Sequence, residues 1–152
     1  MKYSLLLCLL LASTLTIAQD IPTDFRLELE FNAGMYPFRE TLILTSSQGS
    51  YRAFEQGKHF KFAFLAEDTK AIETLYAELK ECGFFKLKLK SKDLIKPESP
   101  TADKSKKTLS VHCLGKGYYL NKSVLKNLNK RQEKIVNKAF EVLKAFTKQY
   151  RS

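Results

Sequence analysis

The stretch FRLELEF at residues 25–31 alternates between apolar and charged side chains without a break. Successive side chains of a β-strand point to opposite faces, so Phe25, Leu27, Leu29 and Phe31 share one face and the charged side chains share the other. A strand with one buried and one solvated face is therefore predicted here. Such strands are typical of antiparallel sheets that are covered on one side only.

Six further segments are rich in β-branched and aromatic residues or alternate in the same way, and each is predicted to be a strand. They are residues 39–45, 51–55, 58–65, 84–90, 108–114 and 118–121. The segments up to residue 65 follow one another through short turns, which predicts an antiparallel meander. A tight turn over Gly115-Lys116-Gly117 is expected to join the last two strands.

Two segments, residues 67–82 and 129–149, instead show the 3.6-residue period of an amphipathic helix. Gly83 offers the left-handed residue that ends the first helix, and Asn129 with Gln132 forms a capping box that begins the second. The fold class that follows is α+β with two layers. A mostly antiparallel meander sheet of about six to seven strands carries the two amphipathic helices on one face.

The N-terminal sequence MKYSLLLCLLLASTLTIAQ has the layout of a secretory signal peptide. Lys2 supplies the positive start, Leu5 through Ala12 form the apolar run, and small residues precede a cut between Ala18 and Gln19. The apolar run is too short to remain in a membrane as a spanning helix. This leader resembles the secretory leaders of Gram-negative bacteria of the Bacteroidota type.

Removal of residues 1–18 leaves residues 19–152, which we expect to form a single α+β domain in the periplasm or outside the cell. No apolar stretch of this mature chain is long enough to be a transmembrane helix. Residues 91–107 are rich in lysine, contain Pro97 and Pro100 and show no periodicity. We expect them to form a mobile exposed loop.

The charge of the mature chain is unevenly distributed. Residues 19–85 carry seven basic and eleven acidic side chains, whereas residues 122–152 carry nine basic and two acidic ones. The candidate anion-binding patch comprises Lys86, Lys88, Lys90, Lys126, Lys130, Arg131 and Lys134. Such a cluster is typical of a surface that binds polyanions, but lysines that protect an edge strand or keep a face solvated give the same pattern. No RNA- or DNA-binding motif accompanies it.

Cys82 and Cys113 are the two cysteines of the mature chain, and both fall on predicted inward faces. In an oxidising compartment two such residues can form a disulfide. The alternative is a pair of separate buried thiols that behave as small apolar side chains. A disulfide requires Cα atoms within about 7 Å of each other, which leaves both interpretations open at this point.

Residues that carry chemistry are few. His112 is next to Cys113, but neighbours in a strand point to opposite faces and cannot act as a pair. Glu28 and Glu30 share one strand face about 6–7 Å apart, a spacing that suits a glycosidase pair but that solubility alone also produces. Neither a metal-ligand spacing nor a cofactor motif is present, so no cofactor is expected.

The leading hypothesis from the sequence is an exported, non-enzymatic binding or interaction module of the cell envelope or extracellular space, with a protein partner. The alternative hypothesis is a protein whose basic surface binds an anionic glycan, lipopolysaccharide or phospholipid. A small hydrolase ranks last, because no catalytic motif supports it.

Overall fold

The computed structural model describes residues 21–33, 38–89, 106–121 and 128–151. Six strands make one sheet: β1 (Arg26–Asn32), β2 (Phe38–Thr45), β3 (Gly49–Glu55), β4 (Lys58–Phe64), β5 (Lys106–Cys113) and β6 (Lys116–Asn121). Two α-helices, α2 (Thr69–Glu81) and α3 (Lys130–Lys148), and two 3-10 turns, η1 (Ala66–Asp68) and η2 (Phe84–Lys86), complete the described chain. The predicted α+β class is confirmed.

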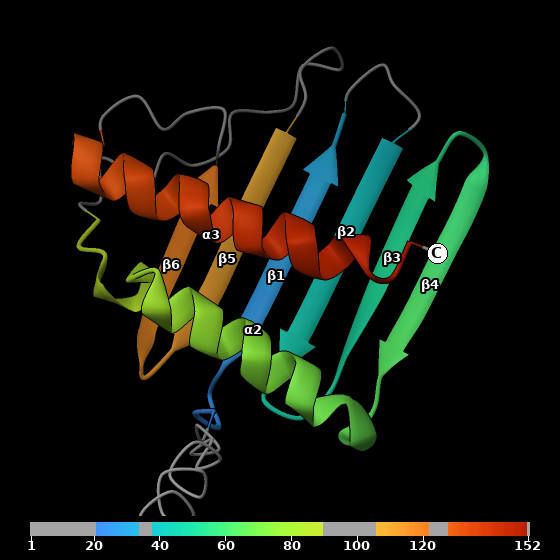
Figure 1. The fold of residues 1–152 in the computed structure, drawn as a ribbon, viewed down its shortest axis with the longest axis horizontal. Coiled ribbons are helices and arrows are strands. Elements are labelled where there is room, and N and C mark those ends of the chain that lie inside the picture. The colour runs from blue at the N-terminus through green and yellow to red at the C-terminus, as the bar shows by residue number, and fades with distance from the viewer. Residues whose placement is uncertain (1–20, 34–37, 90–105, 122–127, 152) are drawn as a thin grey trace, which may run out of the picture.

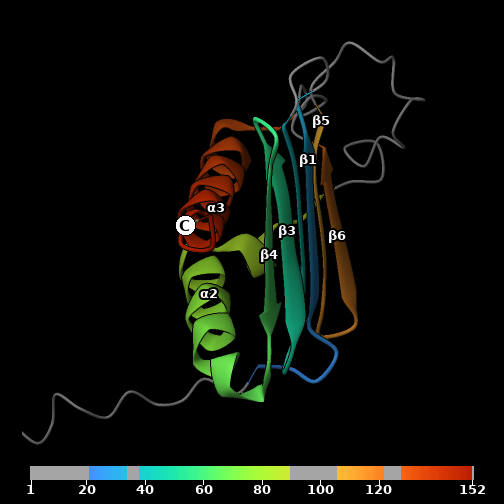
Figure 2. The same ribbon diagram turned by 90° about the vertical axis from the view of Figure 1, so that its right-hand side faces the viewer.

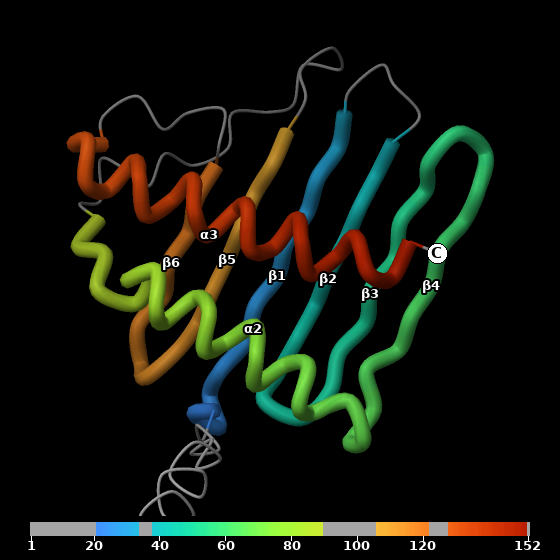
Figure 3. The backbone as a smooth tube through the Cα atoms, viewed as in Figure 1, coloured from blue at the N-terminus to red at the C-terminus, as the bar shows by residue number. Residues whose placement is uncertain are grey.

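The strand order is β4-β3-β2-β1-β5-β6, and all neighbouring strands are antiparallel. The first four strands form the predicted meander, and the β5–β6 hairpin adds to its other side, so that β1 lies inside the sheet (Figure 3). Leu29 of β1 faces Leu42 of β2 and Leu109 of β5 across the sheet. These three side chains are buried, as the alternation of FRLELEF predicts for Leu29.

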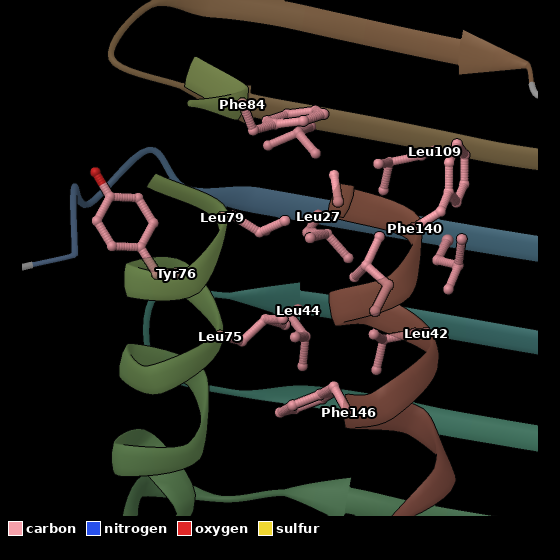
Figure 4. Close-up of a cluster of buried hydrophobic side chains, with 14 of the residues drawn as sticks. Leu27, Leu42, Leu44, Leu75, Tyr76, Leu79, Phe84, Leu109, Phe140 and Phe146 are labelled. Carbon is pink, nitrogen blue, oxygen red and sulfur yellow. The ribbon is translucent and has the colours of Figure 1, made fainter. Parts of the chain in front are cut away.

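Both helices cover the same face of the sheet, and no helix of the described residues lies on the other face (Figures 1 and 2). Leu75 and Leu79 of α2 and Phe140 and Phe146 of α3 point toward the leucines of the sheet (Figure 4). The hydrophobic core therefore fills the space between one sheet face and two helices. Burial of this apolar surface is the main source of stability for such a two-layer arrangement.

The helix ends follow the predicted signals. Gly83 has a φ of 84° directly after the last turn of α2. The Asn129 side chain accepts a hydrogen bond from the Gln132 N–H at 2.9 Å, and the Gln132 side chain accepts one from the Asn129 N–H at 3.0 Å. The predicted capping box is confirmed, and α3 starts at Lys130.

The predicted strand at residues 84–90 is wrong. Phe84–Lys86 is a 3-10 turn, and the described residues that directly follow it, 87–89, belong to no strand. Phe84 is fully buried with its ring 5.3 Å from that of Tyr118, and the Tyr118 hydroxyl donates to the Phe85 carbonyl at 2.8 Å. The segment therefore packs against the inner side of β6 instead of pairing with its edge. The alternation of apolar and charged residues in this segment reflects burial of Leu87 between exposed lysines. It does not reflect pairing with another strand.

Two further boundaries differ from the expectation. Lys106 and Lys107 belong to β5, so the loop predicted at 91–107 is shorter than expected at its C-terminal end. The turn between β5 and β6 consists of Leu114 and Gly115, both with positive φ, and β6 begins at Lys116. The predicted leader and the predicted cut between Ala18 and Gln19 lie outside the described residues, as do residues 91–105.

Candidate functional site

The helices α2 and α3 lie side by side over the sheet (Figures 1 and 2). Residues from the end of α2 and from α3 line a surface groove between them. It comprises three adjoining hollows of about 670, 610 and 620 Å³, and Cys82 lines all three. Cys82 follows the last residue of α2, and the α3 residues that line the groove run from Lys130 to Ala145. Its volume suits a small ligand or one group of a larger one.

One end of the groove is basic. The hollow of about 620 Å³ there is lined by Lys86 and Lys88 from the segment after α2 and by Arg131 and Lys134 from the first turns of α3. These four side chains belong to exposed residues. Glu81 is the acidic residue that lines the same hollow, so positive charge predominates at this end.

The basic end also has an apolar lining. Cys82 and Ile135 are half-buried, and Leu87 is buried, where they line the hollow between the charged residues. A ligand that combines a negative charge with apolar carbon fits such a surface, because burial of apolar carbon adds to the charge attraction.

Gln132 holds the two sides of the basic end together. Its side-chain Oε1 accepts from the Asn129 N–H, and its Nε2 donates to the Lys88 carbonyl at 3.0 Å. The same side chain therefore caps α3 and ties the backbone of the Lys86–Lys88 segment to the start of that helix. The helix N-terminus adds partial positive charge to this end of the groove.

The opposite end of the groove carries more acidic side chains. Glu78, Glu81 and Glu141 line it together with Lys138. Between the two ends, three lysines and two glutamates of α3 line the groove together. The groove thus changes from basic to acidic along its length, and the attraction for an anion is confined to the end near Gln132.

The structure describes five of the seven residues of the candidate anion-binding patch. Four of them, Lys86, Lys88, Arg131 and Lys134, meet around one hollow, and Lys130 lines the adjoining one beside Lys134. Lys90 and Lys126 lie outside the described residues. Sequence reasoning recognised Gln132 as a helix cap but missed its bond to Lys88, because a partner 44 residues away leaves no local pattern.

Cys82 and Cys113 are free thiols in this structure. Cys113 is buried below the helices with its Sγ 4.0 Å from the Tyr76 hydroxyl, whereas Cys82 faces the groove and its thiol contacts the Leu79 carbonyl at 3.1 Å. The disulfide that the sequence left open is therefore not formed here. Burial raises the pKa of both thiols, which makes them poorer nucleophiles at neutral pH.

The remaining candidates lie apart from the groove. His112 is exposed with its Nε2 3.6 Å from Asp24 Oδ2, and Cys113 points to the opposite, buried side. Glu28 lies on the helix-free sheet face, where it accepts a hydrogen bond from Arg26 Nε at 2.9 Å. Within the described residues no group of three or more His, Cys, Asp or Glu side chains is arranged to hold a metal ion.

No protein-family model, curated protein or solved structure matches this chain. None of the helices in the described part of the chain is both long enough and apolar enough to cross a membrane.

Proposed function

We propose that this chain is an exported binding protein without catalytic activity that holds an anionic group in the basic end of the groove between α2 and α3. The observation that carries this proposal is the convergence of Lys86, Lys88, Arg131 and Lys134, from two segments about forty residues apart, around one hollow. The anionic group belongs to a glycan, a lipopolysaccharide or a phospholipid.

Three features of the basic end support binding of an anion. Arg131 offers a planar guanidinium that can bind phosphate, sulfate or carboxylate through two hydrogen bonds. The Gln132 bridge holds the backbone of the facing segment in place, which reduces the entropy lost on binding. The apolar residues between the cations lower the local polarity and strengthen the attraction.

The groove supports binding better than catalysis. The thiol of Cys82 is the nucleophile that lines it, and burial raises the pKa of this thiol. Catalytic cysteines instead have a lowered pKa, because the thiolate is the reactive form. The groups at the basic end therefore suit recognition of an anion without turnover.

A charge-reversal pair tests the proposal. The variant R131E/K134E changes two residues of the basic end, and K144E/K148E makes the same charge change on exposed residues of α3 outside the groove. We expect R131E/K134E to weaken binding about tenfold and K144E/K148E to leave it within about twofold. Binding of residues 19–152 is measured against lipopolysaccharide, alginate and phosphatidylglycerol vesicles, which distinguish the three sources of the anion.

The salt dependence provides the second readout. Binding through the basic end weakens steeply as ionic strength rises. The affinity of R131E/K134E should fall less with salt concentration than that of the parent protein. Equal losses for the two variants, or no binding to any of the three probes at low salt, would contradict the proposal. Export is checked separately by N-terminal sequencing of the natural product, which we expect to begin at Gln19.

A further inference from the structure

The second surface of interest is the outer edge of β4. β4 is the terminal strand of the sheet, and none of the described residues pairs with its outer side (Figure 1). The strand runs for seven residues in unbroken register with β3 and contains neither Gly nor Pro. An edge of this kind presents backbone N–H and C=O groups that can pair with another chain.

The hairpin register shows which backbone groups face outward. Gln56 and Gly57 form a turn of positive φ between Glu55 and Lys58, which are the first pair of the ladder. The two residues next to a two-residue turn exchange both backbone hydrogen bonds. Along the strands, hydrogen-bonded pairs then alternate with pairs that are not hydrogen-bonded to each other. The backbone groups of His59, Lys61 and Ala63 therefore point away from β3, toward the open edge.

The apolar side of the β4 edge is only partly covered. Phe60 and Phe62 lie on the helix side of β4 and are half-buried, and the Phe62 ring lies 4.5 Å from that of Tyr150. At the opposite edge of the sheet, Tyr118 and Leu120 of β6 are 7% and 0% exposed. The two edges thus differ, because β4 still has apolar surface that an added strand would bury.

The charges at the β4 edge define the partner. His59 and Lys61 lie on the helix-free face, Arg52 of β3 lies opposite Lys61, and β4 contains no acidic residue. Two β4 strands that overlap fully would place their Lys61 side chains opposite each other, and directly opposed like charges are destabilising. A strand that carries acidic side chains on this face would instead gain a favourable cross-strand pair.

We propose that β4 binds an extended segment of a protein partner as an additional antiparallel strand, in which acidic side chains alternate with apolar ones. The acidic side chains lie beside Lys61 on the helix-free face, and the apolar ones cover Phe60 and Phe62. Backbone hydrogen bonds to the outward groups of β4 provide affinity, and the alternation provides specificity. This surface is separate from the basic groove, so each proposal can fail without the other.

The experiment uses residues 19–152 and end-capped eight-residue peptides that alternate valine with glutamate or valine with lysine. We expect the glutamate peptide to bind several-fold more tightly than the lysine peptide, and K61E to reverse this preference. Amide hydrogen exchange should slow at His59, Lys61 and Ala63, whose N–H groups gain partners. R131E/K134E is the control that shows the peptide is not in the groove, and its affinity should match that of the parent.

Backbone methylation is the decisive control. In the antiparallel arrangement each glutamate lies on the same face as Lys61, whose backbone groups point toward the peptide. Residues on this face form the hydrogen-bonded pairs, so the N–H groups of the glutamates point toward β4. N-methylation of the glutamates should therefore weaken binding at least tenfold, whereas N-methylation of the valines should leave it within about twofold. Equal effects of the two methylations, equal binding of the two charge types, no binding, or self-association of the protein through β4 would overturn the proposal.

Discussion

Leu114 occupies a backbone conformation that suits few side chains. It has a φ of 52° and is 68% exposed in the turn between β5 and β6, where Gly115 also has a positive φ of 69°. The carboxylate of Asp24 accepts from the N–H of Gly115 at 2.7 Å and from that of Leu114 at 3.0 Å. These hydrogen bonds hold the pKa of Asp24 below its ordinary value and show how the turn is maintained.

Replacement of this leucine should stabilise the protein. The left-handed conformation costs an ordinary side chain about 1 kcal/mol, and Asn-Gly is a preferred sequence for such turns. We therefore expect L114N to raise the free energy of unfolding by about 1 kcal/mol in urea denaturation. L114A is the control, because alanine removes the exposed apolar side chain but lacks the short polar side chain that lets asparagine adopt the left-handed conformation. An equal gain for L114A would show that strain at this position is not the cause.

A charged cluster attaches Arg151, which lies just after the end of α3, to the sheet. Glu40 of β2 is 3% exposed and accepts from Arg151 Nη2 at 2.7 Å and from the Tyr51 hydroxyl at 3.1 Å. Arg151 Nε also donates to the Tyr51 oxygen at 2.8 Å, and the guanidinium lies 4.9 Å from the centre of the Phe38 ring. Arg151 thus bonds to two neighbouring strands.

Loss of Arg151 should destabilise the fold through Glu40. R151A removes the cation and leaves a buried carboxylate without its charge partner, which costs about 3 kcal/mol in the free energy of unfolding. In the double variant E40Q/R151A, the E40Q substitution replaces that carboxylate with a neutral amide. The double variant should therefore be more stable than R151A alone. K148A, on the exposed last residue of α3, should change stability little. Equal stability of R151A and E40Q/R151A would contradict this explanation.

The core as a whole makes the protein sensitive to alkali. Burial raises the pKa of Tyr51 and of Tyr76 to about 12, and it also raises the pKa of Cys113. These groups hold their protons to higher pH in the folded chain than in the unfolded chain. The stability that these groups contribute is therefore fully present below their unfolded pKa values and is lost as the pH rises through their folded pKa values.

We expect the free energy of unfolding to fall as pH rises above about 9, where unfolded thiols ionise, and to fall further between about 10 and 12 as unfolded tyrosines ionise. Urea denaturation at a series of pH values from 7 to 11.5 measures this profile. The variant Y76F removes one of the tyrosine hydroxyls and should flatten the upper part. A constant or rising stability across that range would contradict the prediction.

Much of the fold can be predicted from patterns within single segments. The alternation at 25–31 identified β1 and its buried face, and the Asn129–Gln132 capping box located the start of α3. The error at 84–90 has a physical cause, because alternating burial arises wherever an extended segment lies on a core. Phe84 packs on Tyr118 from the inner side of β6, and no feature within the segment distinguishes that packing from strand pairing.

The candidate site was predicted in its residue types but not in its arrangement. Lys86, Lys88, Arg131 and Lys134 stand out in the chain as basic residues, and the same pattern fits a solvated surface. The Gln132 bond to the Lys88 carbonyl joins the two segments that carry them at this hollow. A hydrogen bond to a backbone carbonyl makes no demand on the residue type that provides it, so the sequence carries no sign of this pairing.

Local chemistry is enough to assign the period of each segment, the helix caps and the excess of positive charge, since these depend on neighbours within one or two turns of the chain. The order of the strands, the edge left open at β4 and the meeting of two basic segments depend on contacts between distant parts of the chain. Those contacts follow from how all the apolar faces are buried together, and no single segment contains that information.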